Sequence, residues 1–160
     1  MKAKLIHQTL DEHRSFNRGR DPKEAMDVGL RAKIRSWLSQ MEIDTYTIND
    51  DLTIDVRDDG INVYLNRKGL SEFPDYIRFG RVRGSFNCSN NRLVSLVGCP
   101  RTVDKFFACN NNELTSLEGC PKSVGKDFIC VGMSNRKKFT EEEIRRTCSV
   151  GRYVLTGLAV

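Results

Sequence analysis

The cysteines are the residues of this chain whose type and spacing most suggest chemistry, and there are six of them. Five recur at intervals of 21 residues in two series, Cys88, Cys109 and Cys130 in one and Cys99 and Cys120 in the other. Structural zinc sites usually contain close pairs such as C-x2-C, and this chain has none. We therefore interpret these five as small side chains that fill a narrow core. We expect Cys148, which lies outside both series, to be the most exposed and reactive thiol.

Other catalytic chemistry has little support in the residues. The only two histidines, His7 and His13, lie in a weakly patterned N-terminal arm, so a cysteine nucleophile has no obvious base. Five aspartates cluster near two turns and could form an acid–base pair or a calcium site, although aspartate is also common in turns for its local hydrogen bonds; they are Asp50, Asp51, Asp55, Asp58 and Asp59. P-loop, GxGxxG, HExxH and GxSxG motifs are missing. We predict no enzymatic activity, no metal site and no cofactor.

Composition describes a folded domain with a mild positive charge. The 160 residues are 39% hydrophobic and 29% charged, with a net charge of +5 spread along the chain. That charge permits contact with nucleic acid but does not demand it. No apolar run approaches the ~20 residues that span a bilayer, and no signal-like stretch opens the chain. We predict a cytoplasmic protein without membrane contact. A disulfide between cysteines of one series is possible in oxidising conditions, because neighbouring strands lie ~4.8 Å apart, within the Cα–Cα range of a disulfide.

An internal repeat organises the second half of the sequence. Residues 85–105 read SFNCSNNRLVSLVGCPRTVDK and residues 106–126 read FFACNNNELTSLEGCPKSVGK. A third copy begins at Phe128 and decays after Cys130, and a degenerate copy with the same apolar pattern precedes the first. Each unit is too short to bury its own apolar residues, so the units must stack.

The parts of the repeat predict its local structure. The alternation Phe-x-Cys is that of a strand with both side chains on one face. Asn91 and Asn112 follow where the chain leaves the strand, and a buried asparagine there can bond the backbone of a neighbouring coil. Leucines then complete the core, and Gly-Cys-Pro marks a sharp corner.

These features resemble the leucine-rich repeat, with its pattern L-x-L-x-x-N-x-L and cysteine allowed at a leucine position. The LTSLEGCP motif at residues 114–121 is similar to short repeats in bacteriophage and bacterial proteins, and the likeness covers about residues 43–135. It implies an α/β fold, a short leucine-rich-repeat solenoid. The strand ladder would run through residues 63–65, 86–88, 107–109 and 128–130 and line a concave face.

The segments around the repeats are predicted to cap the solenoid. We expect an arm at residues 1–20, a helix and β-hairpin cap at 21–62, the solenoid at 63–135 and a C-terminal cap at 136–160. The first cap should hold a helix over about 22–42 that begins at Asp21-Pro22 and has a potential break at Gly29. Trp37 should anchor that helix on the core. The second cap should hold a short helix after Thr140, followed by an apolar tail that docks on the last repeat.

Two surfaces are candidates for binding. The first is the predicted concave face, an extended polar strip of the kind that solenoids use for partners; its residues are Tyr64, Asn66, Arg67, Asn87, Ser89, Asn90, Ala108, Asn110, Asn111, Ile129 and Val131. The second is a basic edge that could meet an acidic protein or a phosphate backbone; its residues are Arg78, Arg81, Arg83, Arg92 and Arg101. Asparagines on the first surface could equally serve solubility and turn formation.

The sequence therefore predicts a non-catalytic protein–protein interaction module. The resemblance to phage and bacterial repeats suggests a structural accessory of a particle or a modulator of a host protein, in the host cytoplasm or the virion. The alternative is a nucleic-acid-associated protein that uses the basic edge. The partner's identity and the oligomeric state are left open by the sequence.

Overall fold

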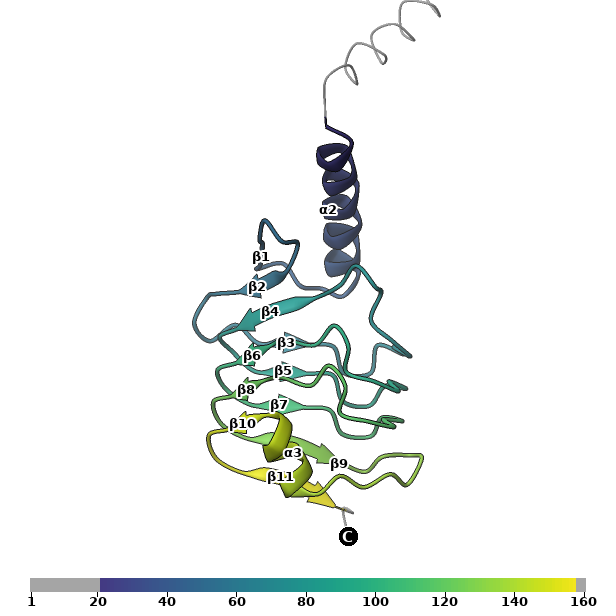
Figure 1. The fold of residues 1–160 in the computed structure, drawn as a ribbon, viewed down its shortest axis with the longest axis vertical. Coiled ribbons are helices and arrows are strands. Elements are labelled where there is room, and N and C mark those ends of the chain that lie inside the picture. Colours follow the sequence, from purple (N-terminus) through teal and green to yellow (C-terminus); the bar gives the residue numbers. More distant parts are fainter. Residues whose placement is uncertain (1–20, 158–160) are drawn as a thin grey trace, which may run out of the picture.

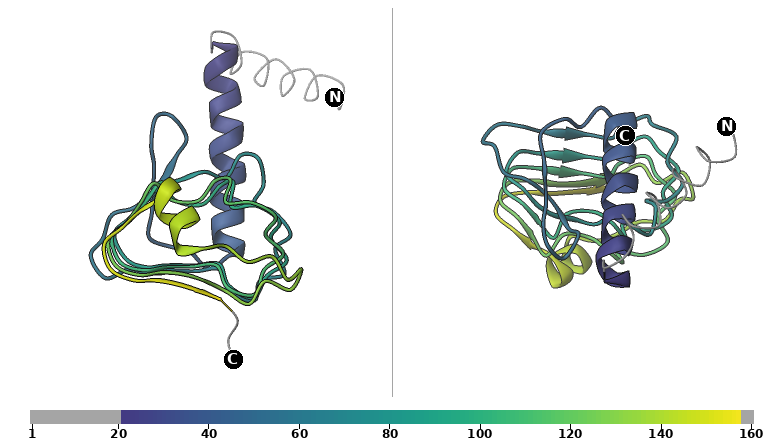
Figure 2. Two further views of the ribbon diagram at one scale, coloured as in Figure 1. Left: turned by 60° about the horizontal axis from the view of Figure 1, so that its bottom comes forward. Right: turned by 90° about the horizontal axis from the view of Figure 1, so that it is seen from above.

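The computed structural model describes residues 21–157 as one long helix at one end of a column of stacked coils (Figure 1). The column is a parallel β-solenoid of about five turns. Seen along its axis, successive coils lie over one another, so the cross-section changes little from end to end (Figure 2). A regular stack of this kind is what a 21-residue repeat with conserved apolar positions dictates.

Each coil contributes one strand to each of two sheets. The six-stranded sheet A consists, in spatial order, of β1 (Thr47–Ile48), β2 (Ile54–Val56), β4 (Phe79–Val82), β6 (Thr102–Val103), β8 (Ser123–Val124) and β10 (Ser149–Val150). The five-stranded sheet B consists of β3 (Val63–Tyr64), β5 (Phe86–Asn87), β7 (Phe107–Ala108), β9 (Phe128–Val131) and β11 (Val154–Gly157). All pairings are parallel except the β1–β2 hairpin.

The strand ladder predicted from Phe-x-Cys is present as β3, β5, β7 and β9, in the predicted register. Sheet A is the part that the sequence analysis missed. Its repeat strands are only two residues long, and each follows the Gly-Cys-Pro corner, where we predicted a turn alone. The inward valines Val82, Val103 and Val124 identify these strands, because they also recur every 21 residues and are buried.

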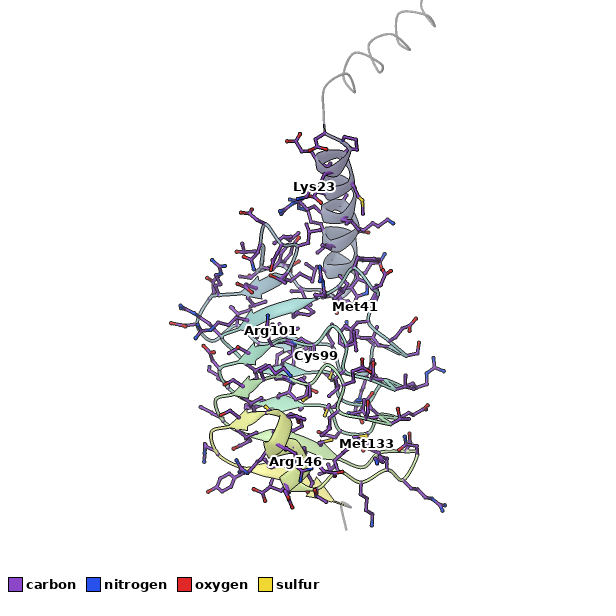
Figure 3. All side chains as sticks on the ribbon, in the orientation of Figure 1. Lys23, Met41, Cys99, Arg101, Met133 and Arg146 are labelled. Atoms are coloured by element: carbon purple, nitrogen blue, oxygen red, sulfur yellow. The ribbon has the colours of Figure 1, made fainter. Side chains whose placement is uncertain are left out.

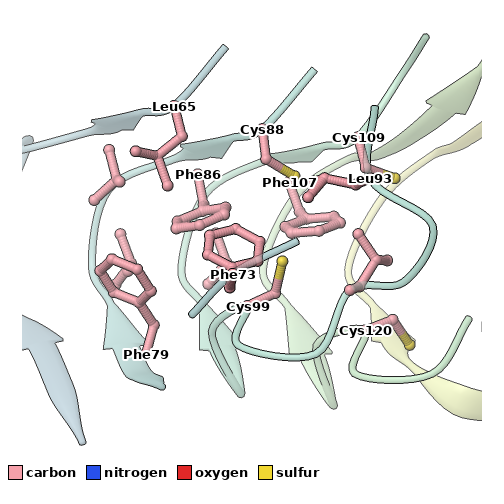
Figure 4. Close-up of a cluster of buried hydrophobic side chains, with 14 of the residues drawn as sticks. Leu65, Phe73, Phe79, Phe86, Cys88, Leu93, Cys99, Phe107, Cys109 and Cys120 are labelled. Carbon is pink, nitrogen blue, oxygen red and sulfur yellow. The ribbon is translucent and has the colours of Figure 1, made fainter. Parts of the chain in front are cut away.

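Phenylalanines stacked along the axis form the centre of the column (Figure 4). The ring centroids of Phe79 and Phe86 are 5.3 Å apart, those of Phe86 and Phe107 are 5.9 Å apart, and those of Phe107 and Phe128 are 5.0 Å apart. All four side chains are fully buried. Each coil thus covers the ring of the one before it, which is why a single coil could not be stable alone.

Buried asparagines tie neighbouring coils together, as predicted. The amide of Asn112 donates to the carbonyl oxygens of Cys88 and Cys109, each at 3.0 Å, and its own oxygen accepts from the Leu93 N–H at 3.0 Å. Asn91 makes the equivalent bonds one coil earlier, to Leu65 and Cys88. These side chains satisfy backbone groups that leave the strand and would otherwise be buried without partners.

The N-terminal cap is α2 (Pro22–Gln40) followed by the β1–β2 hairpin. Asp21 caps the helix by accepting the Lys23 N–H, and the helix continues through Gly29 without the predicted break. Its second half contacts the column: Ile34, Trp37 and Leu38 are buried, and the Arg31 guanidinium donates to the carbonyl oxygens of Ile48 and Asn49 at 3.1 and 2.9 Å. Trp37 packs against Phe73 and Phe79 at centroid distances of 6.1 and 6.5 Å, which confirms its predicted place on the core.

The C-terminal segment completes the column. Helix α3 (Glu141–Thr147) begins at Thr140 with the predicted capping box, in which Thr140 and Glu143 exchange hydrogen bonds. β10 and β11 then add the last strand to each sheet, so the two sheets extend past residue 135, where we placed the end of the solenoid. The predicted N-terminal arm and residues 158–160 of the apolar tail lie outside the described residues.

Candidate functional site

The predicted concave face is the outward surface of sheet B. Its central row follows the strand register and contains one residue from each of the five strands: Tyr64, Asn87, Ala108, Ile129 and Leu155. The row begins with an exposed aromatic residue, continues with a polar and a small one, and ends in two aliphatic residues. The structure therefore brings most of the predicted face residues together, and it adds Leu155, which the sequence analysis left in the tail.

Two polar atoms on this face have no hydrogen-bond partner among the described residues. They are the hydroxyl oxygen of Ser89 and the amide oxygen of Asn110, both buried at the atomic level. Ser89 is 2% exposed and Ala108 is 5% exposed, so these two predicted residues form the floor of the face rather than its contact surface. An unpaired buried oxygen costs free energy unless a bound group supplies a partner.

The predicted residues at the rim of the face have a structural role. Arg67, Asn90 and Asn111 all adopt a left-handed backbone conformation, with φ between 53° and 57°. Asparagine tolerates this conformation better than most residues. The Asn111 amide also donates to the Asn90 side-chain oxygen at 2.9 Å, so the rim is tied together along the column. Turn formation accounts for these asparagines without a ligand.

Acidic neighbours offset part of the predicted basic edge. Arg81 pairs with Asp104 at 2.9 Å, and Arg83 pairs with Asp59 at 3.3 Å. The pKa of the Arg81 guanidinium is raised by its hydrogen bond to Asp104 and by the charge of that carboxylate. Arg92 lies in the loop after the Asn91 turn, away from sheet A. Two of the five arginines are thus neutralised by acidic neighbours that the sequence analysis did not pair with them.

The remaining members, Arg78 and Arg101, line a groove of about 680 Å³. The groove follows the stacked Gly-Cys-Pro corners between the β1–β2 hairpin and α3, and Arg101 and Cys99 are labelled on that side in Figure 3. Lys122 occupies the position one coil below Arg101 and also lines it. The acids Asp51 and Glu118 lie in the same groove, so its three cations face two carboxylates.

The groove corner depends on glycine. Gly119 has φ +80°, and a Cβ there would overlap the backbone of Leu96 and Val97 in the coil above. Pro121 and Cys120 beside it are buried. This packing explains why Gly-Cys-Pro recurs in both complete repeats, and it is a structural explanation rather than a catalytic one.

The aspartate cluster is explained by local bonds. Asp51 accepts from the Thr53 N–H at 3.0 Å and from its hydroxyl at 2.6 Å, and these bonds lower the pKa of the Asp51 carboxyl. Asp55 accepts from the Arg81 N–H at 2.8 Å and pairs with Arg57 at 2.9 Å. Bonds of this kind hold turns and strand ends in place. The pKa values of the Asp51 and Asp55 carboxyls are both lowered, so these two groups are not tuned as an acid and a base.

All six cysteines are buried free thiols. The prediction that Cys148 is exposed is wrong, because α3 and the last coil leave it 1% exposed. Burial raises the pKa of Cys148 to about 12, and it also raises the pKa of Cys120. Protonated, inaccessible thiols are poor nucleophiles and poor metal ligands. Within residues 21–157, no group of three or more potential ligands is placed to hold a metal ion.

In the part of the chain that the structure describes, no helix has the length and apolar character needed to cross a membrane. Comparison of the chain with known proteins found no matching family model, no matching curated protein and no matching solved structure.

Proposed function

We propose that this protein is a non-catalytic protein-binding module that docks its partner on the outward surface of sheet B. The observation that carries the proposal is the aligned, uncharged row that runs across all five strands of sheet B and is exposed at both of its ends, Tyr64 and Leu155. Solenoids bind partners along extended surfaces of this kind.

The composition of the surface fits a protein partner better than a nucleic acid. Its central row contains no charged residue and runs from Tyr64, which is 55% exposed, to Leu155, which is 47% exposed. The centres of protein–protein interfaces are depleted in charge and enriched in tyrosine. Nucleic-acid affinity instead depends on unpaired cations. In the groove along sheet A, Asp51 and Glu118 offset the three cations.

We further propose that the chain is a divergent short leucine-rich-repeat protein of the phage and bacterial type. The 21-residue period, the inward leucines and the buried asparagine turn support this assignment. The second parallel sheet is a departure, because leucine-rich repeats place a helix or other non-strand segment there. Such a setting would make the partner a component of a particle or of the host cell.

The test is affinity capture with an altered face. A variant with Asn87→Lys and Asn110→Lys adds two charges to the centre of the surface, and its control, Ser36→Lys with Ser39→Lys, adds the same charges to the exposed side of α2. Nuclease-treated lysate from the natural host is passed over each protein, and bound proteins are quantified by mass spectrometry. We expect one partner to be retained by the wild type and the control and depleted at least about tenfold by the face variant.

Equal recovery by all three proteins would overturn the face as the binding site. A species that the wild type captures only from a parallel lysate without nuclease treatment would instead favour the nucleic-acid alternative. Circular dichroism and urea unfolding of the face variant establish that lost binding is not lost folding.

A further inference from the structure

The two ends of the column differ in the segments that cover their terminal strands. At the N-terminal end, the segment Met41–Thr45 lies against β3 and lines a hollow with Tyr64, and α2 extends beyond it (Figure 1). At the C-terminal end of sheet A, the Arg145 guanidinium donates to the carbonyl oxygens of Val150 and Arg152 at 3.0 and 2.8 Å. Among residues 21–157, β11 is the terminal strand of sheet B, and no described strand pairs with its outer edge.

The hydrogen-bonding pattern of sheet B shows which groups β11 leaves open. The backbone N–H groups of inward residues donate to carbonyl oxygens of the next coil. Phe86 donates to Phe106, Phe107 to Asp127 and Phe128 to Tyr153 in this way. Val154 and Thr156 occupy the inward positions of β11, because they align with Phe128 and Cys130. Their N–H and C=O groups therefore point to where a further coil would lie, and no strand of residues 21–157 lies there.

We propose that a second copy of this chain pairs with β11, edge to edge and antiparallel, to form a twofold-symmetric dimer. With Leu155 on the twofold axis, Val154 of each copy lies opposite Thr156 of the other. The four open N–H groups and four open C=O groups then form four hydrogen bonds. The same register sets Tyr153 opposite Gly157, above which a side chain would meet nothing within 4 Å. An aromatic ring across from a strand glycine is a favourable cross-strand pair.

The side chains beside this edge favour a copy of the same chain. The outward row becomes apolar only at its last two members, Ile129 and Leu155, and Tyr153 at the edge is 60% exposed. In the dimer, each Leu155 contacts its counterpart, and the apolar ends of the two rows join. The capped N-terminal end blocks head-to-tail stacking, so the association closes at two copies instead of forming a fibre.

The size and charge of the contact set its strength. Stable interfaces bury roughly 1,200–2,000 Å² in total, more than one four-residue strand and its flanking side chains provide. Arg136, Lys137 and Lys138 line a hollow with Gly157, so each copy brings positive charge to the contact. The dimer is therefore weak, and it strengthens with added salt as the repulsion is screened.

Sedimentation velocity of the full chain, from low micromolar concentration to about 1 mM, tests the proposal. Thr156→Pro removes an N–H that points away from β9 and has no strand partner among residues 21–157, whereas Thr156→Val keeps that N–H and serves as its control. We expect a monomer–dimer equilibrium for the wild type and for Thr156→Val, and a dissociation constant at least about tenfold higher for Thr156→Pro. A wild type that stays monomeric throughout this range, in low and high salt, overturns the proposal.

A second variant pair tests the same contact through a side chain. Leu155→Glu sets two like charges against each other on the twofold axis, while Val94→Glu makes the same change at a residue of equal exposure, 47%, on another side of the column. Dimer loss in the first variant alone supports pairing through β11. Equal dimerisation of both variants shows that the copies meet elsewhere, and assemblies larger than a dimer contradict the closed symmetry.

Discussion

At the level of single residues, the buried asparagines join one coil to the next through hydrogen bonds, as the buried leucines do through apolar contacts. The side chain of Asn112 is fully buried, and both its amide nitrogen and its amide oxygen form hydrogen bonds with backbone groups of neighbouring coils. Asn110, two positions earlier, makes no side-chain hydrogen bond within the described residues. The two asparagines thus look alike in sequence and differ entirely in role.

Replacing Asn112 by alanine should destabilise the protein by about 3 kcal/mol, because it leaves two carbonyl oxygens and one N–H buried without partners. Asn110→Ala is the matched control, and it should not lower the free energy of unfolding, because the buried Asn110 oxygen has no hydrogen bond to lose. Urea unfolding followed by circular dichroism measures both. Similar losses for the two variants would show that the asparagine turn does not hold the coils together.

The buried thiols make a second residue-scale prediction, on pH. Burial holds the pKa of Cys148 at about 12 in the folded protein, whereas a thiol in an unfolded chain ionises near ~8.5. Above that value the unfolded state binds fewer protons than the folded one, so stability falls as the pH rises toward 12. Below it the contribution is fully present. Urea unfolding at about pH 8 and pH 10.5 should show a smaller loss for Cys148→Ala than for the wild type. An identical loss would contradict the buried state of this thiol.

At the scale of elements, α2 is a helix of two halves. Its last turns are buried against sheet A, while Met26 and Val28 in its first half are 67% and 53% exposed. Asp21 and Pro22 define where the helix begins, and the packing of Trp37 defines how it is attached. The sequence predicted the start, the spacing and the role of Trp37, since these depend on local signals. The exposure of the first half depends on where the column ends, which no local signal contains.

Trp37→Ala should cost about 3–5 kcal/mol, because it removes a buried ring from between Phe73 and Phe79. Val28→Ala in the exposed half of the same helix should change the free energy of unfolding by less than about 0.5 kcal/mol. Thermal and urea unfolding distinguish the two. A small effect at Trp37 would show that α2 folds and stands without the column.

The two sheets differ in how far the sequence could predict them. Sheet B was predictable because Phe86 and Cys88 alternate over enough residues to show the period of a strand. Sheet A was not, because Thr102–Val103 and Ser123–Val124 are too short to show any alternation. Only the recurrence of one buried valine in each coil marks it. The pairing of Arg81 with Asp104 depends on this missed sheet, which is why the prediction of the basic edge did not include it.

At the scale of the whole molecule, the column is a one-dimensional stack in which every coil contacts its two neighbours. The repeat therefore predicted the architecture, while the surfaces depend on which residues the stacking brings together. The face residues from Tyr64 to Ile129 could be predicted because they share a register position. The groove could not, since it combines residues of the hairpin, two corners and α3.

In the described column, the end coils carry the capping segments, while the two central repeats have nearly the same sequence. The fold should therefore tolerate a change in the number of central coils. A second copy of residues 85–105, inserted after Lys105, should add one strand to each sheet and lengthen the column by ~4.8 Å. The urea m-value should rise with the added buried surface, and small-angle scattering should report the longer particle. A 20-residue insertion that omits Lys105 is the control, because it shifts the register by one residue and turns the inward side chains out. If both insertions fold equally well, the 21-residue period does not set the geometry of the column. If only the 21-residue insertion folds, the length of the column can be set by the number of repeats in the chain.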